Sequence, residues 1–377
     1  MIKNCTKNCG ENCIKKKEKK IKELLVDFNF PFHKLVKHLV EYPDLYNFFK
    51  KYPEKKEQLV IRTKQAVENY RLNNDEDSFN LHRALGWIYE TQIYTPETKP
   101  VFNQFDPTLM EIQRELETAW EKFEMSRIPN LEEIDMPEDP KEFQYWFKRL
   151  VMDHEAADHP LFSYLEKEAS FEDMKEFFSQ EITVDARFDD LVAFSQIGMD
   201  NWAKMELAEN YWDEMGNGRM EEVHTIMFDN LLQELELTNN ESLTSLFDKL
   251  TWEALACGNA LLNTSLYRKN VYKALGCLGS LEMMAPQRFS RLVAGYKRIG
   301  LSQKAQEYHT QHVIIDTRHG NGWLRNAIVP YVKADPSLRY EIVKGAFYRL
   351  NTSLDYCNKL YDRFTQKTLS EEEPQTV

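Results

Sequence analysis

The sequence has few of the residues that break helices and separate strands. Glycine and proline number only 13 and 14 among 377 residues. No segment sustains the alternation of apolar and polar residues that a half-buried strand requires. We therefore expect an almost wholly helical protein.

The sequence also lacks an excess of positive charge and any long apolar run. Its net charge is −13, which disfavours nucleic acid or an anionic membrane surface as a partner. No run of about 18 apolar residues is present to cross a membrane. Residues 1–20 are rich in lysine but contain no apolar core of a signal peptide. We expect a cytoplasmic protein with a flexible basic tail at 1–20.

Cysteine is sparse, at six residues. Cys257, Cys277 and Cys357 lie in helical sequence, where we expect them to be small buried apolar residues. Cys5, Cys9 and Cys13 recur every four residues, but this spacing matches no established zinc pattern. A flexible segment with oxidisable thiols and a three-cysteine metal site both remain open, and we favour the first.

The chain divides at an acidic segment that contains three prolines. This linker ends in a helix-start signal, with Asp139 as N-cap and Pro140 as the first helical residue. The domains we expect are an N-terminal helical accessory or dimerisation domain at 21–128, a linker at 129–140, a second domain at 141–364 and a flexible tail at 365–377. Helices expected in the second domain include 185–215, 219–238, 267–284, 287–298 and 301–318.

The segment 307–320 carries three of the nine histidines. In a helix, His312, Asp316 and His319 follow one another at i, i+4 and i+7 along one face, and His309 lies one turn earlier. Neighbouring apolar residues favour burial, and buried imidazole and carboxylate groups need partners, of which a metal ion is one. A polar face exposed to solvent is the alternative.

A second group of such residues lies at 206–224. Glu221 and His224 are spaced i, i+3, and Glu214 precedes Glu221 by seven residues, so all three share a face if the helix continues. Gly216 and Gly218 interrupt it, which suits either a ligand-binding distortion or an ordinary helix–turn–helix junction.

Glu282 stands alone in a nearly uncharged helical run, where an ionised carboxylate needs a cation or a partner. Three imidazoles and four carboxylates exceed the needs of one ion and suit two, with iron or manganese favoured over zinc. The predicted metal ligands are Glu214, Glu221, His224, Glu282, His312, Asp316 and His319. Asp185, Asp189 and Asp190 could supply a further carboxylate, but no fixed spacing supports this and we interpret them as solvated surface acids.

In the order and spacing of these seven residues, the chain resembles the haem-oxygenase-like diiron oxidases and oxygenases over roughly 141–364. The resemblance implies an all-α fold, a haem-oxygenase-like seven-helix bundle preceded by a smaller N-terminal helical domain. A ferritin-like diiron protein is less suitable, because that pattern needs two Glu-x-x-His motifs and this chain has one.

The resemblance also implies the cofactors and the chemistry. Family members bind two Fe ions, cycle between Fe2+ and Fe3+, use O2 as cosubstrate and contain no haem. Members that oxygenate nitrogen use the seven-residue set, in which Glu214 is the additional carboxylate with a catalytic role. The chain is similar to the diiron N-oxygenase domain of streptozotocin-type nitrosourea synthases, without the cupin domain found there.

We therefore expect an N-oxygenase of natural product biosynthesis that hydroxylates an amine or guanidine nitrogen of a small amino-acid-derived substrate. Tyr211, Arg318 and Arg325 are the candidate substrate-binding residues. An external electron donor and a homodimer are expected, with no nucleic acid and no membrane. The alternatives are C–C cleavage or desaturation of an amino or fatty acid by the same site, and a non-catalytic helical interaction protein.

Overall fold

A computed structural model describes residues 27–71, 75–93, 103–238 and 246–372. Within these ranges the regular secondary structure is helical and no strand is present. The all-α prediction is therefore confirmed. Cys5, Cys9 and Cys13 lie outside the described residues, as do the predicted basic tail and the last residues of the C-terminal tail.

The chain forms two compact units, Met1–Glu117 and Thr118–Val377. The division falls inside a helix, earlier than the linker at 129–140 on which our predicted domains depend. The C-terminal part of that helix joins the second unit, because the Glu121 carboxylate lies 3.1 Å from Lys273 Nζ. The segment 129–140 is mainly non-helical and lies within the second unit.

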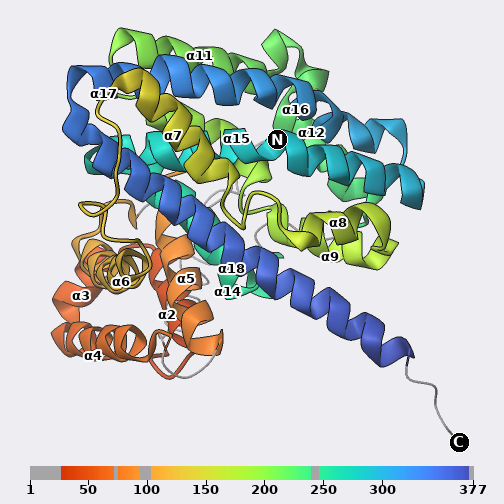
Figure 1. Ribbon diagram of the computed structural model, residues 1–377. Helices are drawn as coiled ribbons and strands as arrows, with labels where there is room; N and C mark the ends of the chain where they lie inside the picture. Colours follow the sequence, from red (N-terminus) through yellow and green to blue (C-terminus); the bar gives the residue numbers. More distant parts are fainter. Residues whose placement is uncertain (1–26, 72–74, 94–102, 239–245, 373–377) are drawn as a thin grey trace, which may run out of the picture. The chain divides into compact units, whose positions relative to one another are not determined.

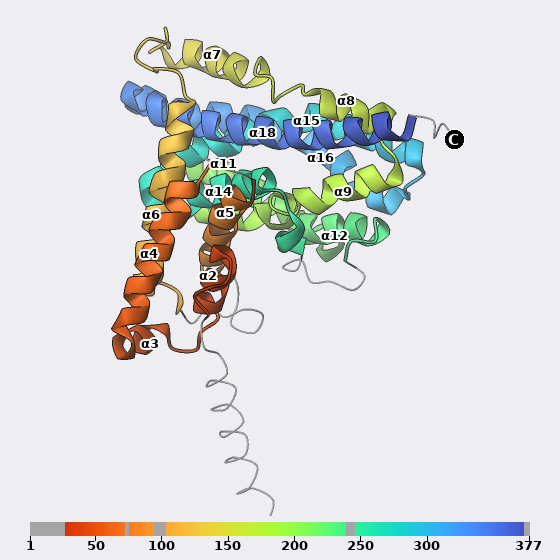
Figure 2. The ribbon, with the colours of Figure 1, turned by 90° about the horizontal axis from the view of Figure 1, so that it is seen from below.

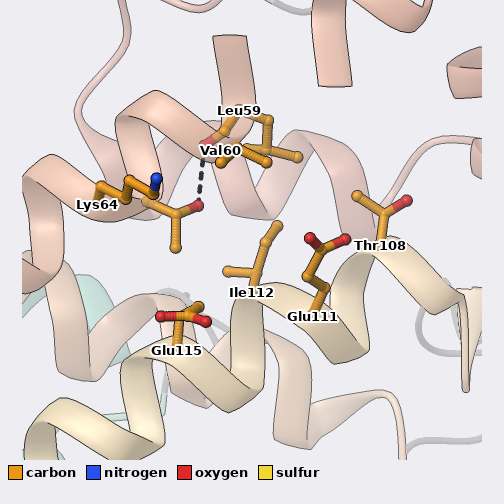
Figure 3. Close-up of a pocket in the computed structure, with 8 residues that line it drawn as sticks. Leu59, Val60, Lys64, Thr108, Glu111, Ile112 and Glu115 are labelled. Carbon is orange, nitrogen blue, oxygen red and sulfur yellow. Dashed lines mark hydrogen bonds between the residues drawn. The ribbon is translucent and has the colours of Figure 1, made fainter. Parts of the chain in front are cut away.

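The first unit consists of short helices around a small apolar core. Both α2 and α4 pack on α5, and α3 packs on α4. A pocket of about 260 Å³ lies between α4 and the start of α6 (Figure 3), with Leu59 and Ile112 among its apolar lining residues. The helices are α2 Phe32–Val40, α3 Leu45–Lys51, α4 Pro53–Asn69, α5 Asp75–Glu90 and, shared with the second unit, α6 Pro107–Ser126.

The second unit holds the longer helices (Figure 1). Its α-helices are α7 Pro140–Met152, α8 Pro160–Lys167, α9 Phe171–Glu181, α10 Phe188–Ser195, α11 Asn201–Glu214, α12 His224–Glu234, α14 Trp252–Leu266, α15 Val271–Ile299, α16 Gln303–Gly322, α17 Val329–Ala334 and α18 Arg339–Glu372. Short 3-10 turns are η2 Asp185–Arg187, η3 Gly216–Gly218, η4 Met220–Glu222, η5 Phe247–Lys249, η6 Arg268–Asn270 and η8 Pro336–Leu338, and η7 Trp323–Ile328 is a π-helix.

Polar side chains cap several of these helices at the positions that the sequence indicates. The Asp139 carboxylate accepts hydrogen bonds from the backbone N–H groups of Lys141 and Glu142, with Pro140 in the first turn, as predicted. The Ser302 hydroxyl accepts from the backbone of Ala305 and begins α16. Each cap satisfies backbone donors that the first turn leaves without partners.

Helix α15 is the core of the second unit and packs along both α16 and α18 (Figures 1 and 2). Glycines allow α15 and α18 to approach closely, since a Cβ at Gly276 would lie 1.8 Å from the Ile342 carbonyl oxygen. Close packing of this kind holds neighbouring helices rigidly, which suits a site built from several of them.

Two expected helix boundaries were wrong. The expected helix at 185–215 is broken between α10 and α11, where Gly198 has a φ of +79°. The expected helices at 267–284 and 287–298 form the single helix α15, with Pro286 in its interior. An interior proline costs about 3 kcal/mol, and the packing of α15 on both neighbours offsets this cost.

No helix among the described residues is long and apolar enough to cross a membrane. Cys257, Cys277 and Cys357 are buried free thiols, as expected.

Candidate metal centre

A sharp reversal of the chain joins α11 to α12 and places their ends together. Gly216, Asn217 and Gly218 all have positive φ values, of 60°, 53° and 85°. A side chain at Gly216 is excluded, because its Cβ would lie 2.5 Å from the backbone of Glu222. The reversal brings Glu214, the last residue of α11, to His224, the first residue of α12.

Two long helices supply the other acidic and imidazole groups. Helix α16 presents His312, Asp316 and His319 on its buried face, as its i, i+4, i+7 spacing predicts. Helix α15, which packs along α16, presents Glu282. All four of these side chains are buried.

The first group consists of Glu214, His224 and His312, whose ligand atoms all lie within 4.8 Å of one another. His224 Nδ1 lies 2.8 Å from Glu214 Oε2. His312 Nδ1 donates a hydrogen bond to the Tyr308 carbonyl oxygen at 2.6 Å, which leaves Nε2 as its available ligand atom. Two histidines and one carboxylate form the donor set typical of non-haem Fe(II) oxygenases.

The second group consists of Glu282, Asp316 and His319, with ligand atoms again within 4.8 Å of one another. His319 Nδ1 lies 3.7 Å from Glu282 Oε2 and 3.8 Å from Asp316 Oδ1. Asn210 Nδ2 donates to Glu282 Oε1 at 3.0 Å and orients that carboxylate.

The two groups are close enough to interact electrostatically. The charge on Glu214 acts on Glu282, Asp316 and His319, all in the second group. His312 and Asp316 are four residues apart on α16, which corresponds to a rise of about 6 Å. This separation is compatible with two metal ions about 3.5–4 Å apart.

Burial shifts the pKa values of these groups toward their neutral forms, except at His319. There burial lowers the pKa, but the hydrogen bond to Asp213 and the charges of Glu282 and Glu214 outweigh it and raise the pKa above its usual value. Burial raises the pKa of Glu214 and that of Glu282 to about 7. It lowers the pKa of His224 to about 4 and that of His312 to about 3. At neutral pH both imidazoles are therefore neutral, as metal ligation requires.

One further observation indicates that the second group could hold a metal ion. His319 Nδ1 is buried and has no hydrogen-bond partner among the described residues. It faces two carboxylate oxygens at distances too long for hydrogen bonds. An ion with bonds of about 2.1 Å separates its ligand atoms by roughly 3–4 Å. The donor atoms present therefore suit a transition metal, with iron or manganese the best match to mixed imidazole and carboxylate ligands.

One predicted ligand does not join either group. Glu221 is exposed in the 3-10 turn η4, separated from α12 by the extended residue Val223. We expected Glu221 and His224 to share a helical face, but the strained reversal at Gly216 ends the helix before that face can form. The structure thus brings together six of the seven predicted ligands.

The predicted substrate-binding residues lie outside both groups. Arg318 is 58% exposed and forms an ion pair with Asp213. Arg325 is exposed on η7, and Tyr211 is half-buried on α11.

Sequence reasoning missed Asn210 and Asp213. Both lie on α11, where Asn210 precedes Asp213 by three residues and Glu214 by four, spacings that place Asn210 on the same side of the helix as each of them. Asp213 Oδ2 accepts a hydrogen bond from His319 Nε2 at 2.8 Å. Burial alone would raise the pKa of Asp213, but the hydrogen bonds from His319 and Asn217 and the charge of Arg318 lower it to about 2.

The interpretation of Asp185 as a solvated acid was wrong. Asp185 is buried, and burial together with the charge of Glu181 raises its pKa well above the usual value. Asp189 is half-buried and close enough to interact with the charges of His224 and Glu214. Asp190 is exposed. These acids lie on η2 and α10, whose burial no local spacing in the sequence reveals.

A helical bundle that buries two adjoining His/carboxylate groups is characteristic of a dimetal protein. Residues 175–353 match the model of a haem-oxygenase-like family described as iron-containing redox enzymes. The matched segment is just under half of the chain and contains all six grouped residues. This part of the chain is therefore similar to iron-containing redox enzymes, which supports the predicted haem-oxygenase-like bundle. No curated protein matches the chain.

Proposed function

We propose that the protein is a non-haem diiron oxygenase that hydroxylates an amine or guanidine nitrogen of a small amino-acid-derived substrate. The observation that carries the proposal is the pair of adjoining buried groups, which share helix α16. Nitrogen is proposed as the oxidised atom from the order and spacing of the seven residues in the sequence, which resemble those of N-oxygenating family members. The grouping in space supports six of these residues, because Glu221 lies outside both groups.

In this proposal Glu214, His224 and His312 would hold one iron ion, and Glu282, Asp316 and His319 would hold the other. Bound iron would supply the redox chemistry that activates O2. One oxygen atom of O2 enters the N–H bond to give N–OH, and the other leaves as water. The reaction consumes two protons and two electrons, which an external electron donor provides.

The protein groups contribute orientation and proton handling. Glu214 interacts electrostatically with His312 of the first group and His319 of the second. In the metal-free protein burial raises the pKa of Glu214 to about 7, and a bound iron ion would displace the proton that it carries below this pH. Tyr211 and Arg325 remain the proposed substrate contacts, whereas Arg318 is engaged by Asp213.

A product assay tests the proposed reaction. Iron-loaded protein, a reductant and O2 are incubated with amino acids that carry amine or guanidine side chains, and the products are analysed by mass spectrometry. The proposal predicts an N-hydroxylated product that gains one oxygen atom from 18O2. Release of an alkene or aldehyde instead would favour C–C cleavage and contradict N-oxygenation.

Two variants connect this activity to the grouped residues. The variant His312→Ala removes one ligand of the first group and is expected to lower turnover at least 100-fold. The variant Glu221→Ala tests whether Glu221 is a ligand in addition to the six grouped residues. Because Glu221 is exposed and outside both groups, turnover within about twofold of wild type is expected. A large loss in Glu221→Ala would restore Glu221 as a ligand.

A further inference from the structure

The Asp213 carboxylate lies beside the second group without belonging to it. It accepts hydrogen bonds from His319 Nε2 at 2.8 Å and from Asn217 Nδ2 at 3.0 Å. Arg318 completes this arrangement through an ion pair with Asp213 Oδ2. Three side chains from two segments thus converge on one carboxylate.

This arrangement determines which nitrogen of His319 is free. A neutral imidazole carries its proton on one ring nitrogen and a lone pair on the other. With Nε2–H donated to Asp213, the lone pair lies on Nδ1, the atom that faces Glu282 and Asp316. Nδ1 is buried and has no hydrogen-bond partner among the residues that the structure describes.

We propose that Asp213 is a positioning residue that holds His319 in the orientation and tautomer needed to bind iron, and that Arg318 and Asn217 hold Asp213 in turn. This inference rests on the proposed diiron function. It assigns Arg318, a predicted substrate-binding residue, to the support of a ligand. Carboxylates that orient a ligating histidine commonly change metal affinity by 10–100-fold when they are removed.

The reversal after α11 has a role in this arrangement. Asn217 has a φ of +53° between two glycines that also have positive φ. This conformation turns the Asn217 amide back toward Asp213, four residues earlier. Asn and Gly are the residues that tolerate such backbone angles most readily, so the Gly-Asn-Gly sequence serves both the chain reversal and the support of Asp213.

Anaerobic Fe(II) binding to the full-length chain, measured by calorimetry, tests the proposal without an activity assay. The variants Asp213→Ala and Asp213→Asn are expected to weaken binding of one of two ions by 10–100-fold. Arg318→Ala should weaken it by less than about tenfold, because Arg318 is largely exposed and exposed ion pairs contribute little. Glu209→Gln, which removes an exposed acid from the same helix, is the control and should bind as wild type does.

A double-mutant cycle separates positioning from a general structural role. If Asp213 acts through His319, then Asp213→Ala added to His319→Ala should weaken binding no further. Additive losses would overturn the inference, as would wild-type affinity in Asp213→Asn. Thermal unfolding of each metal-free variant checks that it is folded, and a variant that melts below the assay temperature is replaced in the cycle by Asp213→Asn.

The same Fe(II) titration shows whether the diiron proposal or only the role of Asp213 is wrong. A wild-type chain that binds no iron would contradict the diiron proposal and this inference together. A wild-type chain that binds two ions, with unchanged affinity in the Asp213 variants, would contradict only the role of Asp213.

Discussion

At the residue scale, the candidate metal centre consists of ionisable groups, most of which burial shifts toward their uncharged forms. Isolated buried charges are costly, so such groups either lose their charge or find a counterion. Glu214 and Glu282 are partly protonated near neutral pH in the metal-free protein, because burial raises their pKa values to about 7. Two metal cations would reverse this effect and return both groups to carboxylates.

Iron binding should therefore release protons in a pH-dependent manner. Below pH of about 7, Glu214 and Glu282 carry protons that the metal must displace, and above it they are already ionised. His224 and His312 are neutral at all pH values above about 4. The apparent affinity should rise as the pH increases through about 7, where Glu214 and Glu282 ionise.

Calorimetric titrations in buffers of different ionisation enthalpy measure this release. More protons should be released per ion at pH 6 than at pH 8. Equal release at both pH values would show that these carboxylic acids do not titrate near neutrality.

At the element scale, α16 is the part of the candidate site that the sequence predicts best. Three ligands at i, i+4 and i+7 define one face of a helix, and the helix forms as that spacing predicts. The predicted pair Glu221 and His224 does not share a helical face, although its i, i+3 spacing is equally regular. The difference is the chain reversal at Gly216, which spacing alone does not reveal.

The chain reversal at Gly216 predicts that two glycine substitutions lower the free energy of unfolding by different amounts. Both Gly216 and Gly198 have positive φ, but an added Cβ clashes only at Gly216. Gly198→Ala should destabilise the protein by about 1–2 kcal/mol, the usual cost of this backbone region for alanine. Gly216→Ala should cost more and should also weaken iron binding, because the reversal sets the position of His224 relative to Glu214.

Urea unfolding and Fe(II) titration of the two variants provide the comparison. Gly198→Ala serves as the control for backbone strain alone. Equal destabilisation and equal iron affinity in both variants would contradict this role for the reversal.

At the scale of the whole molecule, the helical class and the grouping of six candidate ligands could be predicted from the sequence. Scarce glycine and proline indicated helices, and the number of His and carboxylate residues at helical spacing led to the prediction of a dimetal site. The neighbours Asn210 and Asp213 were missed because their importance depends on the packing of α11 against α15 and α16. Burial of Asp185 likewise arises from tertiary contacts, and the continuity of α15 through Pro286 shows packing overriding a local signal.

The division of the chain also depends on packing. The first unit ends within α6, whose later residues contact the second unit through Glu121. A proline-rich acidic segment was the strongest local signal for a boundary, yet it lies inside the second unit. Our predicted domain limits, and the homodimer, remain predictions.

In the proposed diiron oxygenase, one chain holds two adjoining iron ions. Mössbauer spectroscopy of 57Fe-loaded full-length protein, combined with iron analysis, measures the number of ions and their magnetic coupling. We expect two iron ions per chain that become magnetically coupled ferric ions after exposure to O2. One ion per chain, or two ions that remain magnetically isolated, would contradict this proposal.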